Sequence, residues 1–109
     1  MVQVVENLTW LSGRLVGRQP HPQRAGWDVV IVHVEVARPV PDKADLLSRH
    51  EGEDLPVGFR HELLADARPG AHLTFRARFT PAGALAEAYP DEGDLVVRPI
   101  QPPSSPPAH

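Results

Sequence analysis

Residues 27–40, WDVVIVHVEVARPV, constrain the fold more than any other part of the sequence. Seven of these fourteen residues are aliphatic and β-branched, and such side chains favour strands. Alternate positions carry Val30, Val32, Val34 and Val36. Because side chains two apart share one face of a strand, this face is predicted to point into a core. The other face becomes polar at His33 and Glu35, so we expect it to be half covered and half available to a ligand.

A second alternating stretch, AHLTFRARFT over residues 71–80, predicts another strand with one apolar face. The side chains expected to point inward are Leu73, Phe75, Ala77 and Phe79. The side chains expected to point outward are His72, Thr74, Arg76, Arg78 and Thr80. Two neighbouring guanidinium groups suit phosphates or carboxylates. The alternative is a solvated face on which each Arg pairs with a nearby Asp or Glu.

The remaining elements are short. Residues 2–18 read as a long first strand, bent at Gly13 and Gly17. Two short helices are predicted, over residues 43–49 with Asp42 as the N-cap and over residues 59–67 before Gly70.

The end of the chain adds two more predicted elements. Residues 84–89 follow a PAG turn and suit either a returning strand or a helical turn, and the turn favours the strand. Residues 95–100 form the last predicted strand.

Length and composition predict one domain over residues 1–100, followed by a disordered Pro-rich tail, QPPSSPPAH, over residues 101–109. The 109 residues include no cysteine, which excludes disulfides, thiolate metal sites and Cys nucleophiles. We find no signal peptide and no membrane span in the sequence, and we expect a cytoplasmic protein. The net charge of −3 lacks the strongly basic footprint of a dedicated nucleic-acid binder.

The order of these elements resembles the OB-fold, a small and mainly β barrel, closed or partly open, with one or two short helices. The resemblance rests on the Gly-containing first strand LSGRLVGR, the long second strand and the segment ARPGAHLTFRARFTPAG, and it covers roughly residues 8–100. A third strand would have to lie between Lys43 and Phe59, where turn and helix signals dominate. A split barrel and a small β-sandwich stay open as alternatives. The resemblance implies a binding face on the second and third strands for oligonucleotides, oligosaccharides or proteins.

Six residues are candidates for contact with a ligand: Arg76, Arg78, Arg14, Trp27, Trp10 and His33. The three Arg side chains suit phosphates, and the two tryptophans are the aromatic residues most suited to stacking on a base. A structural role for both tryptophans is the alternative, because tryptophans are highly buried on average.

The sequence predicts neither a catalytic site nor a metal site nor a cofactor. His50, His61 and His72 are spaced eleven residues apart, which matches no compact set of metal ligands. His33 and Glu35 share a strand face as a conceivable acid–base pair, but no full catalytic constellation accompanies them. No glycine-rich phosphate loop is present in the sequence.

These features together predict a non-enzymatic OB-like module that binds single-stranded DNA or RNA. A protein-interaction module, or a subunit of a larger assembly, is the alternative. Acids locked onto Arg76 and Arg78 would weaken the nucleic-acid interpretation, and a large exposed apolar patch would favour a protein partner.

Overall fold

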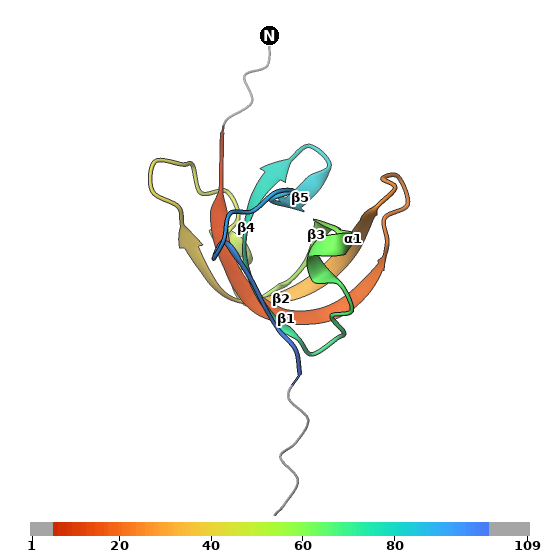
Figure 1. The fold of residues 1–109 in the computed structure, drawn as a ribbon. Coiled ribbons are helices and arrows are strands. Elements are labelled where there is room, and N and C mark those ends of the chain that lie inside the picture. The colour runs from red at the N-terminus through yellow and green to blue at the C-terminus, as the bar shows by residue number, and fades with distance from the viewer. Residues whose placement is uncertain (1–5, 101–109) are drawn as a thin grey trace, which may run out of the picture.

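A computed structural model describes residues 6–100, and the described part contains six strands, one short helix and one 3-10 turn (Figure 1). Their bounds are β1 Thr9–Pro20, β2 Trp27–Pro39, η1 Ser48–His50, β3 Asp54–Arg60, α1 His61–Leu64, β4 His72–Thr80, β5 Gly83–Ala86 and β6 Leu95–Arg98. The predicted start of the first strand at Val2 and the predicted disordered tail over residues 101–109 lie outside the described residues.

Five of the strands close into a barrel in the order β1-β2-β3-β5-β4, and β4 pairs back onto β1. The pairing of β3 with β5 is parallel, and the other pairings are antiparallel. β6 is an extra strand that pairs with β4 over His72–Phe75, beside the part of β4 that pairs with β5. The mainly β fold class is therefore confirmed, and a closed barrel with α1 between β3 and β4 is consistent with the predicted OB-like fold.

β1 pairs with β2 along one edge and with β4 along the other, and it curves with the barrel (Figure 1). Its register against β2 shifts between Ser12 and Gly13 and again between Leu15 and Gly17. At Gly13 the backbone passes so close to β2 that an added Cβ would lie 2.0 Å from the carbonyl oxygen of His33. The prediction that glycines mark the bend of this strand is thus confirmed, since such a shift increases local twist.

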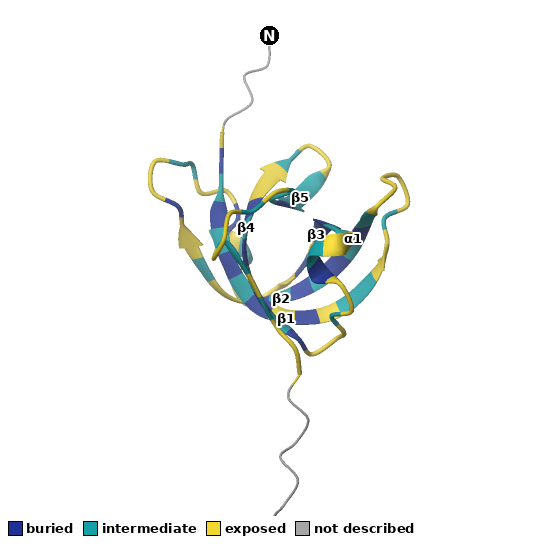
Figure 2. Ribbon diagram, in the orientation of Figure 1, coloured by how far each residue is buried: buried dark blue, intermediate teal, exposed yellow. Residues whose placement is uncertain are grey.

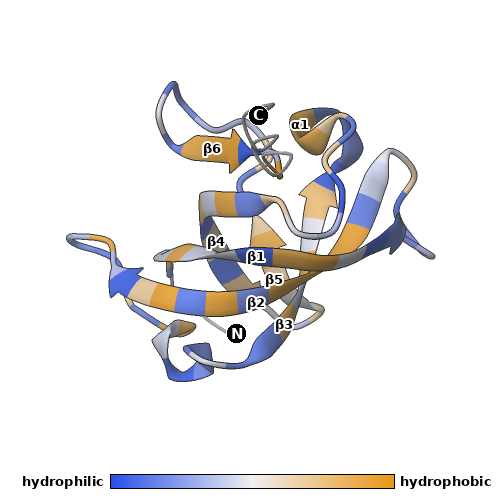
Figure 3. Cartoon of the chain, turned by 90° about the horizontal axis from the view of Figure 1, so that it is seen from below, coloured by the Kyte–Doolittle hydropathy of each residue, from blue (hydrophilic) through white to orange (hydrophobic). Residues whose placement is uncertain are grey.

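The core lies where the inward faces of the strands meet, and Figure 2 shows buried and more accessible residues alternating along β1 and β2. Figure 3 shows hydropathy alternating along the second half of β2, whereas residues 29–32 are all apolar. The predicted core residues Val30, Val32, Val34, Leu73, Phe75 and Ala77 are buried. At the centre, the rings of Phe59 and Phe75 meet edge to face with their centroids 4.7 Å apart.

Two predicted core side chains are exposed instead. Val36 is 46% exposed, because the pairing of β2 with β3 ends at His33 and β2 then runs past the barrel. Phe79 is 41% exposed, because the pairing of β4 with β1 ends at Ala77. In both cases the apolar residue keeps the inward-pointing position of its strand, but it lies past the point where the neighbouring strand ends and so stays partly exposed.

The third strand, β3, lies at the end of the segment in which it was expected, whereas the predicted helices need correction. Phe59 and Arg60 end β3 rather than begin a helix over residues 59–67, and α1 stops before Ala65, whose φ is 47°. The predicted helix over residues 43–49 is replaced by the short turn η1. Asp42 has a φ of 67° and is not its cap. Instead the carboxylate of Asp45 accepts a hydrogen bond of 3.1 Å from the backbone N–H of Ser48.

Candidate ligand groove

A broad groove of about 1550 Å³ runs over the outer surface of β3 and β5 and continues along the loops beside them. Its floor follows one row of directly paired residues across four strands, in the order Val29, Gly58, Leu85 and Arg78. Gly58 keeps this floor flat, since an added Cβ would lie 2.8 Å from Cδ1 of Leu85. The loops 21–26, 40–53 and 81–82 contribute the walls of the groove.

The residues that line the groove carry an excess of positive charge, although the whole chain carries −3. They include five Lys and Arg side chains and two Glu side chains. Both Glu side chains are paired, because Glu6 binds Lys43 and Glu87 binds Arg76. The exposed guanidinium groups of Arg24, Arg49 and Arg78 have no carboxylate partner among the described residues.

Stacked cations and aromatic rings border the groove on the side of loop 21–26. The guanidinium of Arg24 lies 4.8 Å from the ring centroid of Trp27. Trp27 is paired directly with Arg60 in the sheet, and Arg60 lies 4.5 Å from the ring centroid of Tyr89. Tyr89 is 81% exposed, and Arg24 and Tyr89 both line the groove. These four side chains form two cation–aromatic pairs, which we call together the stacking ladder.

Arg76 lines the groove but is held by two carboxylates. Its Nε and Nη2 donate hydrogen bonds of 2.6 and 2.8 Å to the two carboxylate oxygens of Glu87, and Nη2 also lies 2.8 Å from Oδ2 of Asp94. The hydrogen bonds from Arg76 to Glu87 are the main reason that the pKa of this guanidinium is raised above its ordinary value, against an opposing effect of burial. Arg76 therefore fits the alternative in which each Arg of this strand face pairs with a nearby Asp or Glu.

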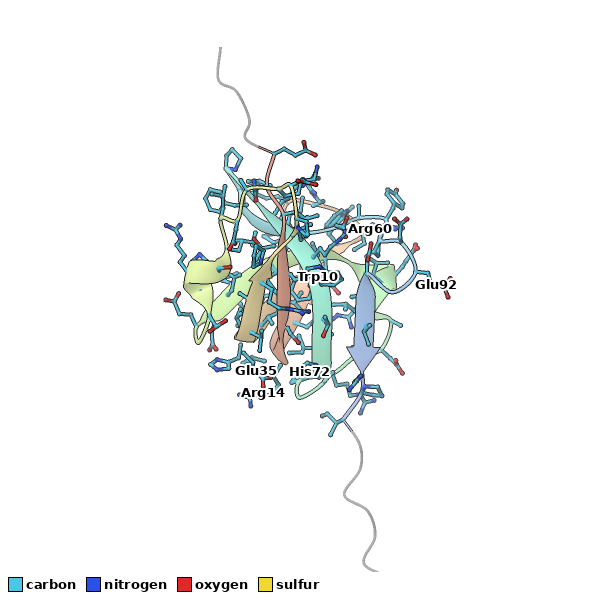
Figure 4. The ribbon with its side chains drawn as sticks, turned by 90° about the vertical axis from the view of Figure 1, so that its left-hand side faces the viewer. Trp10, Arg14, Glu35, Arg60, His72 and Glu92 are labelled. Carbon is cyan, nitrogen blue, oxygen red and sulfur yellow. The ribbon has the colours of Figure 1, made fainter. Side chains whose placement is uncertain are left out.

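The other predicted ligand residues lie on a second face, formed by the outer side of β1 and its neighbours (Figure 4). Arg14 on β1 is paired directly with His33 on β2 and with His72 on β4. Trp10 is paired with Arg38 and Arg76 in the same way, and the guanidinium of Arg76 lies 5.7 Å from its ring centroid. The structure therefore brings Arg78 and Arg76 to the groove, and it leaves Trp27, Trp10, Arg14 and His33 outside the lining. Trp27 contacts Arg24, which lines the groove.

The polar side chains considered for catalysis or metal binding have separate partners. Nδ1 of His33 lies 2.7 Å from Asp54, whereas Glu35 faces His72 at 3.6 Å. The three evenly spaced histidines contact three different carboxylates, with the pairs His50–Glu53, His61–Asp28 and His72–Glu35. Among residues 6–100, no three or more His, Asp or Glu side chains gather in a group that could hold a metal ion.

Sequence reasoning missed four residues of this site: Arg24, Arg49, Arg60 and Tyr89. Arg24 had a usable signal, because it stands three residues before Trp27 in a short loop that leads into a strand. Tyr89 and Arg60 gave no signal in the sequence, because they are 29 positions apart and meet only in the folded barrel.

None of the helices in the described part of the chain is both long and apolar enough to cross a membrane. Comparisons of the chain with protein-family models, with curated proteins and with solved structures give no match.

Proposed function

We propose that this chain is a non-enzymatic, cytoplasmic binding module of the OB-fold type that holds single-stranded nucleic acid in the groove. The observation that carries the proposal is the set of three guanidinium groups, Arg24, Arg49 and Arg78, that border the groove without a carboxylate partner among the described residues. In a chain with an overall charge of −3, this local excess favours an anionic ligand.

The stacking ladder favours nucleic acid over other polyanions. Unpaired bases stack on aromatic rings and guanidinium planes with little regard to sequence. Trp27 and Tyr89 supply the rings, and the apolar floor at Val29 and Leu85 supplies further contact area. Because the bases of a duplex are already stacked and covered, we expect single strands to bind more tightly than duplexes.

The roles of the predicted residues follow from their positions. We assign phosphate contact to Arg78, with Arg24 and Arg49, and base stacking to Trp27. Arg76 is a weaker phosphate ligand than expected, because Glu87 and Asp94 already neutralise it. Arg14, Trp10 and His33 do not line the groove, although Trp10 is paired with Arg76, which does, so we assign none of the three to the ligand.

A protein partner is the second candidate, and the exposure of Phe79 favours it. This ring is 41% exposed and lines the groove next to Pro81. An apolar side chain in a groove is a typical anchor point for a partner. A pull-down from native lysate with and without nuclease separates the two, since a nucleic-acid bridge is lost on digestion and a direct protein contact is retained.

The test of the proposed function is a fluorescence-anisotropy titration with labelled single-stranded oligonucleotides of about 15 nucleotides. Three phosphate contacts on a single strand predict that log K falls with log salt at a slope of about −2, so that affinity drops about 15-fold between about 50 and 200 mM salt. Arg78→Gln should reduce the steepness of that slope by about 0.7, and Arg14→Gln should leave it unchanged. No binding at low salt would end the proposal.

A further inference from the structure

The segment between β5 and β6, residues 87–94, lines the groove at residues 87–89, contacts Arg76 through its first and last residues, and carries four carboxylates, Glu87, Asp91, Glu92 and Asp94. We call this segment the strap. Two of its carboxylates, one near each end, converge on the same guanidinium, because Glu87 and Asp94 both bind Arg76. The strap is therefore closed onto the barrel by ion pairs at both of its ends.

A second arginine holds the middle of the strap. Nη1 of Arg60 donates a hydrogen bond of 2.9 Å to the backbone carbonyl of Ala88, and its guanidinium stacks on Tyr89. The strap thus engages two cations, of which Arg76 lines the groove, and it places Tyr89 in the stacking ladder.

The Arg76 contact has the geometry of phosphate recognition. Parallel hydrogen bonds from Nε and Nη2 to two oxygens of one group are how a guanidinium holds either a carboxylate or a phosphate. The side chains of Arg76, Glu87 and Asp94 are 22, 26 and 20% exposed. Solvent and ions therefore reach this cluster while the barrel stays folded.

The strap as a whole is not free to lift away. Pro90, Asp94 and Leu95 lie beside the Phe59–Phe75 pair and leave no space there that could hold a water molecule. Raising the strap would expose this part of the core to water, which is costly. An exchange of partners at Arg76 needs only side-chain rotation of Glu87 and Asp94.

We propose that the strap is an intramolecular competitor of nucleic acid, in which Glu87 and Asp94 occupy Arg76 in place of a backbone phosphate and so limit the affinity of the groove. This inference rests on the proposed function. It explains why a guanidinium that lines the groove is already neutralised, and it makes Glu87 and Asp94 residues that set affinity and salt dependence.

The test compares two double variants that remove the same number of charges. Glu87→Gln with Asp94→Asn frees Arg76, whereas Asp66→Asn with Glu92→Gln removes two exposed carboxylates that make no described contact. In the oligonucleotide titration at about 50 mM salt, the first variant should bind about fivefold more tightly than the second and show a salt slope steeper by about 0.7. Equal affinities and equal slopes would overturn the inference.

A measurement on the unaltered chain covers the case in which the first variant fails to fold. The Nε–H resonance of Arg76 should move during an oligonucleotide titration, because Glu87 leaves it and a phosphate arrives. A resonance that stays fixed while Arg78 responds overturns the competition but leaves the proposed function standing. If neither the unaltered chain nor the freed variant binds at low salt, the proposed function fails and the inference fails with it.

Discussion

The side chain of Asn7 pairs with the backbone of Phe79 as a neighbouring strand would. Nδ2 of Asn7 donates a hydrogen bond of 3.1 Å to the carbonyl oxygen of Phe79, and Oδ1 accepts one of 2.6 Å from its N–H. Asn7 is 7% exposed, and the pairing of β1 with β4 has already ended at Ala77. One side chain thus satisfies the backbone of β4 on the edge where its pairing with β1 has ended.

Asn7→Ala should therefore destabilise the fold. It removes both hydrogen bonds and leaves the backbone groups of Phe79 without them, which predicts a loss of about 1–3 kcal/mol in the free energy of unfolding. Urea unfolding followed by circular dichroism measures this loss. Gln23→Ala, in the exposed loop 21–26, is the control and should change stability by less than about 0.5 kcal/mol. An Asn7 variant as stable as the control would contradict the assigned role.

The bend of β1 should tolerate a methyl group at one glycine and not at another. A Cβ at Gly13 would lie 2.0 Å from the carbonyl oxygen of His33, whereas a Cβ at Gly17 has Ile31 Cγ1 at 3.8 Å as its nearest neighbour. Gly13→Ala should cost about 3 kcal/mol of stability, because backbone must move, and Gly17→Ala should be close to neutral. Thermal unfolding of the two variants makes the comparison, and similar melting temperatures would show that the strands are not this close at Gly13.

The buried carboxylate of Asp28 should make stability depend on pH in the acidic range. Burial is the largest single influence and disfavours the carboxylate, but the hydrogen bonds and the charges of Arg18 and His61 together outweigh it and hold the pKa below 3.8. Because the folded state then binds fewer protons than the unfolded state, the contribution is complete above the unfolded pKa. It is lost as pH falls through the folded pKa.

Asp28→Asn should lower stability at neutral pH by about 1–3 kcal/mol, because Arg18 loses a charged acceptor at 2.7 Å. The same variant should lose less stability than the unaltered chain when pH falls below 4, and melting curves recorded from neutral to acidic pH measure both effects. Asp66→Asn, at an exposed position, should keep the pH profile of the unaltered chain. Parallel profiles for the unaltered chain and Asp28→Asn would count against the ion pair.

Tryptophan fluorescence can show which of the two tryptophans stacks on a bound base. Trp27 belongs to the stacking ladder beside the groove, and Trp10 lies on the second face against Arg76. Oligonucleotide binding should quench tryptophan emission, and Trp27→Phe should remove most of that quenching. Trp10→Phe should retain it. The reverse pattern would move the binding site to the face of β1.

Sequence alternation predicted the two strands that build most of the core. Every second residue is apolar over residues 30–34 and 73–77, and the structure buries these positions, so the buried faces follow from the geometry of a strand. β3 was not predicted because Pro56 and Gly58 interrupt its pattern. Phe59 was assigned to a helix because its spacing to Leu63 fits a helical period, although the barrel places it opposite Phe75.

The candidate site was less predictable, for a different reason. Alternation shows which residues of one strand share a face, but not which strands become neighbours. Arg76 and Arg78 were rightly placed on one face of β4, yet the partners of Arg76 come from residues 87 and 94, which the turn after β5 brings back. The groove joins Arg24, Arg49 and Arg78 from three distant loops and strands, and no local pattern links them.

The most direct test of the account is an oligonucleotide titration of two triple variants with the same change in charge. One variant changes the groove residues Arg24, Arg49 and Arg78 to Gln, and the other changes Arg14, Arg38 and Arg98, which are exposed on β1, β2 and β6. The account predicts that the first loses salt-dependent binding, with a slope that falls from about −2 towards zero, while the second stays within about twofold of the unaltered chain. Equal loss of affinity in the two variants would show that the groove does not hold the nucleic acid.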